Sequence, residues 1–382
     1  MLIREEDPAR RARAPPSSLT THLSPLSFIL YPSSLILHPP MLLGIEIGGT
    51  KLQLGVGRGD GPPLVEIERL DVEPDRGAEP IRAQVAQAAK RLIDRHEVTA
   101  IGIGFGGPVD VATGRTITSH QVEGWQDFPL GDWSRETFGL PTVVSNDSDS
   151  AGLAEARFGA GKGHRVVFYT NVGSGIGGAL VIDGQLYRGG SGVASEMGHL
   201  RPGLQCDRPD QTLESMASGF GITAAVQARL AGEGSHRMES LVRGERPTEP
   251  DAVRQRLIER EEADEKDTAD LLERCDGQVD RLTAKTIAQA ATAGNRLARE
   301  VFDHASQAFG WAIAQMATLI APNIVVVGGG VSLVGEELLF IPLRNHMRRY
   351  IFPPLDGTFD VVPAKLGEEV VVHGVLALAA EH

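Results

Sequence analysis

The fold is decided by the stretch Gly44-Ile45-Glu46-Ile47-Gly48-Gly49-Thr50-Lys51, which joins a buried apolar strand to a glycine-rich turn. Such a turn leaves several backbone N–H groups free to converge on an anion, and glycine adopts a positive φ without steric cost. Thr50 adds a hydroxyl group and Lys51 a positive charge, and both suit phosphate oxygens. Because glycines occur in any tight hairpin, one such turn alone is weak support for a phosphate site.

A second glycine turn follows further along the chain, at Asn171-Val172-Gly173-Ser174-Gly175-Ile176-Gly177-Gly178. It repeats the order of the first, an apolar strand followed by a turn with little side-chain bulk. The pair Asn146-Asp147 lies between the two turns in the sequence. Two such turns together predict a nucleotide whose phosphate tail is held from two sides.

Asp147 follows a short β-branched strand expected at residues 142–145, and it is the candidate general base. Phosphoryl transfer to an alcohol needs one residue that accepts the hydroxyl proton, while Mg²⁺ and backbone donors hold the phosphates. An aspartate at a strand tip, opposite a glycine turn, suits that role. The alternative is a helix cap, because Asn-Asp-Ser before the helix expected at 151–158 is also a common helix start.

The composition favours some classes of protein over others. A chain of 382 residues predicts two lobes of common domain size. The formal net charge of −13 argues against a nucleic-acid partner. Cys206 and Cys275 are the only cysteines, which is compatible with a reducing cytoplasm. No uninterrupted apolar run is long enough to span a membrane, so we expect no membrane partner.

The segment before Met41 differs from the rest of the chain. Pro25, Pro32, Pro39 and Pro40 interrupt any apolar core that a secretory signal would need. The segment also lacks the two periodic helices of a DNA-reading helix-turn-helix. We expect residues 1–40 to be a disordered tail, or an upstream extension from a misplaced start codon.

From Leu42 to the C-terminus the chain resembles the ROK family of sugar kinases and sugar-responsive repressors, within the actin-like ATPase superfamily. The motifs follow the family order over most of the chain, which argues against a chance match. They occupy residues 43–51, 103–110, 124–130, 146–147 with 155–161, 172–199 and 323–331.

The resemblance implies an α/β fold, the two-lobed actin-like ATPase (ribonuclease H-like) fold. Its lobes are duplicated, of βββαβαβα type, with an interlobe cleft. We expect an N-terminal lobe at 41–160 with the first phosphate motif and the catalytic aspartate. A C-terminal lobe at 161–382 then carries the second phosphate, sugar and adenosine motifs, and within it residues 229–284 form an acidic, solvated helical insertion.

The resemblance also implies the site residues. Asp147 is the catalytic base. The residues implied for ATP and Mg²⁺ are Glu46, Gly48, Gly49, Thr50, Lys51, Gly173, Ser174, Gly175, Gly177, Gly328, Gly329 and Gly330. The residues implied for the hexose are Gly107, Asn146, Asp147, Glu196, His199 and Glu214. Carboxylate groups suit a sugar, because each oxygen accepts a hydrogen bond from a hydroxyl group.

One departure from the family concerns zinc. Most members carry three cysteines after the histidine, and these bind a structural zinc together with it. Here Cys206 is the one cysteine in that loop, and Gln211 and Thr212 stand in place of the last Gly-Cys. Because a closed tetrahedral zinc site needs four ligands, we expect no bound metal of this kind. Packing and hydrogen bonds must then hold the loop that positions His199 and Glu214.

The resemblance implies ATP-dependent phosphorylation of a hexose at its primary hydroxyl, in a glucokinase-like, cytoplasmic homodimer. The alternatives are a kinase for N-acetylglucosamine, N-acetylmannosamine, fructose or mannose, or one that uses polyphosphate. An alternative of another class is a non-catalytic, sugar-responsive regulator. That regulator would need a DNA-binding domain before Met41.

Overall fold

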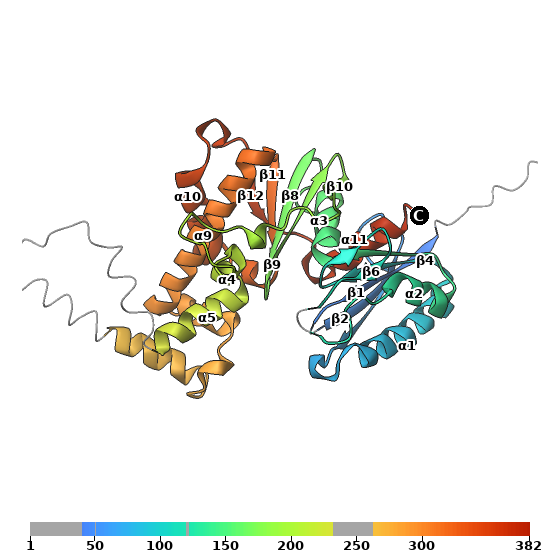
Figure 1. Ribbon diagram of the computed structural model, residues 1–382, viewed down its shortest axis with the longest axis horizontal. Coiled ribbons are helices and arrows are strands. Elements are labelled where there is room, and N and C mark those ends of the chain that lie inside the picture. Colours follow the sequence, from blue (N-terminus) through green and yellow to red (C-terminus); the bar gives the residue numbers. More distant parts are fainter. Residues whose placement is uncertain (1–39, 50, 120–121, 232–262) are drawn as a thin grey trace, which may run out of the picture. The chain divides into compact units, whose positions relative to one another are not determined.

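The computed structural model describes residues 40–49, 51–119, 122–231 and 263–382 (Figure 1). Thr50, predicted as a phosphate contact, lies outside the described residues. The same holds for the segment before Pro40 and for residues 232–262 of the expected insertion.

The first sheet has five strands in the order β3-β2-β1-β4-β7. Strands β1, β2 and β3 form an antiparallel meander, whereas β1, β4 and β7 run parallel. Their bounds are β1 Met41–Ile47, β2 Lys51–Gly57, β3 Glu66–Asp71, β4 Val98–Phe105 and β7 Thr142–Asn146. Ile47 pairs with Phe105, and Phe105 with Asn146, so three parallel strands end side by side.

The second sheet repeats this plan in the order β10-β9-β8-β11-β12. Its antiparallel part is β10-β9-β8 and its parallel part β8-β11-β12, which confirms the predicted duplication. The bounds are β8 Val166–Val172, β9 Ile176–Ile182, β10 Gln185–Tyr187, β11 Ile324–Gly328 and β12 Asp360–Pro363. A further two-stranded ribbon pairs β5 (Val109–Asp110) with β6 (Arg115–Thr116).

Helices α3, α10 and α11 follow the parallel strands β7, β11 and β12, whereas the other helices follow antiparallel strands or one another. Their bounds are α1 Ala78–His96, α2 Leu130–Phe138, α3 Asp147–Arg157, α4 Leu213–Ala217, α5 Gly219–Leu230, α8 Ala284–Thr292, α9 Arg296–Ile320, α10 Ile341–Tyr350 and α11 Val370–Ala379. On α1, Ile81, Val85, Ala89 and Leu92 form an apolar stripe that is buried against the first sheet.

Helices α3 and α11 link the two sheets. On α11, Val372 and Leu376 pack against the first sheet, while Leu153 of α3 packs with strands of the second. Glycine permits the close approach, because a Cβ at Gly44 would meet the Val372 carbonyl oxygen at 2.9 Å. A Cβ at Gly374 would overlap the backbone of α3. Close packing of α11 therefore requires glycine at positions 44 and 374.

The described part of the expected insertion packs into the second lobe more than its charge suggests. A helical stretch at 263–273 follows the residues that the structure leaves undescribed. Leu271, Cys275 and Leu282 are buried in the core formed around α9. In the part of the chain that the structure describes, no helix has the length and apolar character to cross a membrane.

Candidate active site

The candidate site is built where the parallel strands of the first sheet end. Gly48 follows β1, Gly106 follows β4 and Asp147 follows β7. A Cβ at Gly106 would lie 3.4 Å from the Gly48 Cα and 3.6 Å from Asp147 Oδ2. The structure therefore brings together the first glycine turn, the candidate base and the turn at Gly106-Gly107-Pro108, called the Gly-Pro turn below.

Asp147 is the first residue of helix α3, not the tip of a strand. The cap of this helix is Asn146, whose Oδ1 accepts from Ser148 N at 2.8 Å and from Asp149 N at 3.2 Å. The helix thus starts four residues earlier than predicted, since an asparagine cap precedes Asp147. Asp147 Oδ1 accepts from Ser148 N at 2.7 Å. Burial raises the pKa of Asp147, and these hydrogen bonds oppose the rise.

The side chain of Asn146 is already engaged with the protein. Its Nδ2 donates to the Gly107 carbonyl oxygen at 3.0 Å and lies 3.5 Å from that of Phe105. Asn146 and Gly107, both predicted to bind sugar, are therefore bonded to each other. The contact ties the Gly-Pro turn to the start of helix α3.

Glu46 faces the first turn from β1 and is held by two neighbours. Gln53, its cross-strand partner on β2, donates from Nε2 to Glu46 Oε2 at 2.7 Å. Lys51 Nζ lies 3.6 Å from Glu46 Oε1. Gln53 is fully buried, and its Oε1 accepts from Arg69 Nε at 3.1 Å. Burial raises the pKa of Glu46 to about 7, against the opposing effects of Lys51 and Gln53.

The second glycine turn joins β8 to β9 and keeps some backbone donors free. Gly173 N donates to the Gly175 carbonyl oxygen at 2.9 Å, and Gly177 N donates to Asn171 Oδ1 at 3.1 Å. Gly177, predicted to contact nucleotide, has therefore already used its N–H group. The N–H groups of Ser174 and Gly175 have no partner within the described ranges. They remain available to an anion.

The third glycine stretch follows β11 and packs on the second turn. Gly328 pairs with Asn171, and a Cβ at Gly329 would meet the Val172 backbone at 2.5 Å. Gly329 also has a φ of 85°, which favours glycine. Gly330 then opens a 3₁₀ turn. The two predicted nucleotide segments of the second lobe are thus in direct contact.

The three predicted sugar residues of the second lobe lie near one another. Burial raises the pKa of Glu196; His199 opposes this rise and Glu214 adds to it. His199 N donates to the Glu196 carbonyl oxygen at 3.1 Å. Glu214 Oε2 accepts from Ile176 N at 2.8 Å, so one carboxylate oxygen of Glu214 is hydrogen-bonded to the backbone of the second glycine turn. Ser195, before Glu196, has a φ of 66°, which strains a residue with a side chain.

A pair of residues absent from the sequence predictions adjoins this cluster. Asp149 Oδ2 lies 3.4 Å from Nε of Arg188, which starts the loop that leads to Glu196. Burial raises the pKa of Asp149 to about 6, Arg188 opposes the rise, and Glu196 and Asp147 add to it. A carboxylate two residues after the base was visible in the sequence. The sequence does not indicate that Arg188 pairs with this carboxylate, because Arg188 lies 39 positions further along the chain.

The loop without the family's cysteines is held by hydrogen bonds. Thr212 caps helix α4, since its Oγ1 accepts from Ser215 N at 3.3 Å while Ser215 Oγ accepts from Thr212 N at 3.0 Å. Leu213 N donates to the Leu200 carbonyl oxygen at 2.7 Å. This capping box stands at the position where a family member has a cysteine. Within the described ranges, no cluster of three or more His, Cys, Asp or Glu residues has metal-binding geometry.

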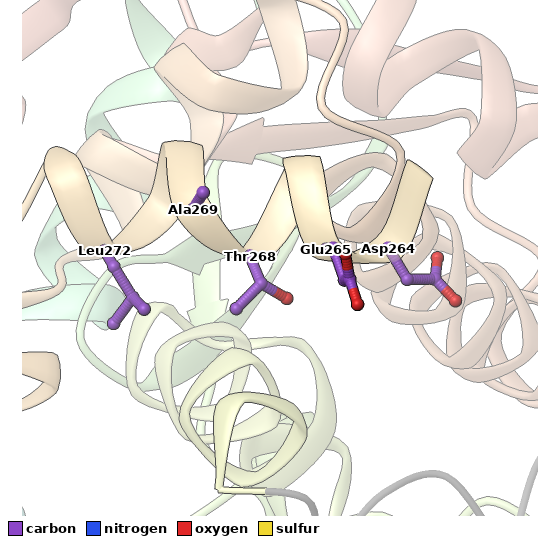
Figure 2. Close-up of a pocket in the computed structure, with 5 residues that line it drawn as sticks. All are labelled: Asp264, Glu265, Thr268, Ala269 and Leu272. Carbon is purple, nitrogen blue, oxygen red and sulfur yellow. The ribbon is translucent and has the colours of Figure 1, made fainter. Parts of the chain in front are cut away.

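A separate hollow lies beside the helical stretch 263–273. Figure 2 shows that Asp264, Glu265, Thr268, Ala269 and Leu272 line it, all from this one helix. None of the predicted site residues lies there.

Two sheets of the same plan, each with a glycine turn, define a protein of the actin-like ATPase fold. The chain belongs to the ROK family, whose sequence model matches residues 42–382. It is 31% identical over 349 residues to a glucokinase of Streptomyces coelicolor, covering 89% of this chain and 98% of the relative. It is 29% identical over 344 residues to a glucokinase of Thermotoga maritima, covering 89% of this chain and 97% of that relative.

A solved structure resembles the chain over a similar length. It is the ROK family glucokinase of Streptomyces griseus in complex with glucose and AMPPNP. The TM-score is 0.70 at 30% identity, covering 90% of this chain and all of the other. The comparison supports the predicted fold.

Proposed function

We propose that this chain is an ATP-dependent glucose kinase that forms glucose 6-phosphate. The observation that carries the proposal is that Asp147 Oδ2 lies beside Gly106 and the first glycine turn at Gly48, where three parallel strands of the first sheet end. Its relatives from Streptomyces coelicolor and Thermotoga maritima are named glucokinases, and their match covers nearly their whole length.

In this proposal Asp147 is the general base. Its Oδ1 is bonded to Ser148, which leaves Oδ2 to accept the proton of the sugar's primary hydroxyl group. The sugar oxygen bonds to the γ-phosphorus as the bond from that phosphorus to the bridging oxygen breaks, and ADP leaves with the electron pair. A raised pKa suits this step, because a base works best when its pKa approaches the operating pH.

The nucleotide is held by backbone N–H groups and by Lys51. Ser174 and Gly175 supply donors from the second turn, and Gly49 lies in the first. Glu46 suits the binding of Mg²⁺ through a water molecule, since Gln53 and Lys51 hold its carboxylate in place beside the first glycine turn. The ion supplies charge neutralisation at the phosphates when bound. Gly328, Gly329 and Gly330 are assigned to the adenosine side.

The hexose is held by Glu196, His199 and Glu214, whose acceptors suit sugar hydroxyl groups. Asn146 fixes the Gly107 turn against the substrate from the other side. We further propose a cytoplasmic homodimer, with lobes at 41–160 and 161–382. Both cysteines are free thiols, in keeping with a reducing compartment. Light scattering of the purified chain tests the oligomeric state.

A coupled assay of the purified protein against hexoses and phosphate donors tests the activity. We expect ATP with glucose to give the highest kcat/KM. Faster turnover of N-acetylmannosamine, N-acetylglucosamine, fructose or mannose, or of polyphosphate as donor, would reassign the substrate. No turnover with any pair would contradict the kinase.

A further inference from the structure

One short segment touches both the proposed sugar site and the second glycine turn. We define the linking segment as residues 212–220, which contain α4 and the start of α5. It begins at the capping box of Thr212 and ends at Phe220. Its two ends are bonded to different functional parts of the same lobe.

The sugar end of the linking segment is tied to the turn that carries His199. Leu213 is fully buried, and its N–H donates to the carbonyl oxygen of Leu200, the neighbour of His199. Glu214 is near enough to Glu196 to raise the pKa of that carboxyl group. The Leu213–Leu200 hydrogen bond therefore joins the residue before Glu214 to the turn that carries His199.

The nucleotide end grips the second glycine turn at three points. Glu214 Oε2 accepts from Ile176 N at 2.8 Å. Gly219 N donates to the Gly173 carbonyl oxygen at 2.8 Å, and Phe220 N donates to that of Ser174 at 3.3 Å. These bonds hold the turn from outside and leave the Ser174 N–H group without a protein partner in the described chain.

Glycine at position 175 is part of the same contact. A Cβ there would overlap the Glu214 carboxylate, and the residue has no positive φ that would otherwise require glycine. The Glu214 carboxylate, 39 positions further along the chain, thus occupies the space that a side chain at position 175 would need. The turn and the carboxylate fit each other as one unit.

We propose that Glu214 is a positioning residue that couples the two substrates: sugar binding orders Glu214, and Glu214 fixes the second glycine turn for the nucleotide phosphates. The inference rests on the proposed function. Because coupling between two sites is reciprocal, the nucleotide must tighten sugar binding by the same factor. A residue that only contacts sugar, or only stabilises the fold, produces no such mutual effect.

Isothermal titration calorimetry tests this with AMPPNP and glucose, each titrated with and without the other at fixed Mg²⁺. In the wild-type protein we expect each ligand to tighten the other by about fivefold or more, within the usual range of coupling. We expect Glu214→Ala to reduce that factor to within about twofold of unity. Glu273→Ala, the same change at an exposed carboxylate, is the matched control and should keep the factor.

Gly175→Ala is the second variant, and it leaves Glu214 in place. Its methyl group would overlap Glu214 Oε2, so the carboxylate or the turn must shift and the coupling factor should fall toward unity, as in Glu214→Ala. Equal coupling in all variants, or none in the wild-type protein, would overturn the inference. A wild-type protein that binds neither ligand would instead contradict the proposed function.

Discussion

Ser148 Oγ donates a hydrogen bond of 2.9 Å to Asn171 Oδ1, which joins the residue after the proposed base to the second glycine turn. The same Oδ1 accepts from Gly177 N. A Cβ at Gly177 would overlap the Ser148 hydroxyl group. The base and the phosphate turn are thus set relative to each other by one serine and one asparagine.

Ser148→Ala should lower kcat while KM for glucose changes little. The variant removes the link to Asn171 and the 3.3 Å hydrogen bond from Ser148 Oγ to Asp147 Oδ1, but keeps the backbone bond from position 148 to Asp147 Oδ1. Loss of one hydrogen bond of this kind costs about 1 kcal/mol, or roughly fivefold in rate if it acts only in the transition state. Steady-state kinetics measure the split, and Ser148→Thr, which keeps the hydroxyl group, should recover part of the loss. An unchanged kcat would show that neither of these contacts has a catalytic role.

Asp147→Asn should abolish most of the turnover. The change keeps the shape of the side chain and removes the proton acceptor, and loss of a general base commonly costs about 10²–10⁴-fold in rate. We expect kcat to collapse while AMPPNP affinity, measured by calorimetry, changes little. A near-normal kcat would mean that Asp147 serves only the first turn of helix α3.

The strands and turns could be predicted because their signals are local. Apolar runs that end in glycine indicate strands in both lobes, although β8 continues to Val172 within the second glycine turn, since Val172 still pairs with Ile176. The start of helix α3 was placed too late, because Asn146 was not recognised as its cap. Local residue preferences do not predict the exact end of a strand or helix where β-sheet pairing or a helix cap determines it.

Contacts between distant positions could not be predicted. Nothing near Glu46 indicates that Gln53 will donate to it, since both read as ordinary strand residues. Likewise, the family motif marks Glu214 but not its bond to Ile176. Such contacts depend on the register of strands and on loop geometry, which a single sequence does not specify.

Glu46→Gln should change how stability depends on pH. Burial raises the pKa of Glu46 from 4.5 to about 7, so between these values the folded protein binds more protons than the unfolded chain. Stability is therefore lost as the pH rises through this window, by an amount on the order of 3 kcal/mol. Glutamine does not ionise, so the melting temperature of the variant relative to wild type should be higher at pH 8 than at pH 5, without Mg²⁺.

The matched control for this pH effect is Glu273→Gln, at an exposed carboxylate. Its melting temperature should follow that of wild type at both pH values. If Glu46→Gln also followed wild type, Glu46 would already be ionised in the folded protein at low pH.

Purified protein should contain no stoichiometric zinc. The capping box of Thr212 and Ser215 and the bond from Leu213 to Leu200 hold the loop beside His199 without thiolate ligands. A strong chelator, added without Mg²⁺, should therefore leave the melting temperature unchanged. One zinc per chain by elemental analysis would contradict this and would implicate Cys206 with Asp207 and Asp210.

Thr212→Val tests whether the helix cap at Thr212, rather than a metal, holds the same loop. It removes the oxygen that caps α4, and loss of a cap costs about 1 kcal/mol. We expect a lower melting temperature and weaker glucose binding, because Glu214 follows two positions later. Addition of zinc should restore neither quantity, whereas rescue by zinc would show that a metal site had been overlooked.

A chain that begins at Met41 should phosphorylate sugar as well as the full-length chain. The family match starts at residue 42, and strand β1 starts at Met41. The prolines before it prevent a continuous helix or central strand, and the segment has no periodic apolar face to bury. Melting temperature and kcat/KM should therefore agree within error between the two proteins. A clear fall in either on truncation would mean that the first forty residues contribute contacts to the folded lobes.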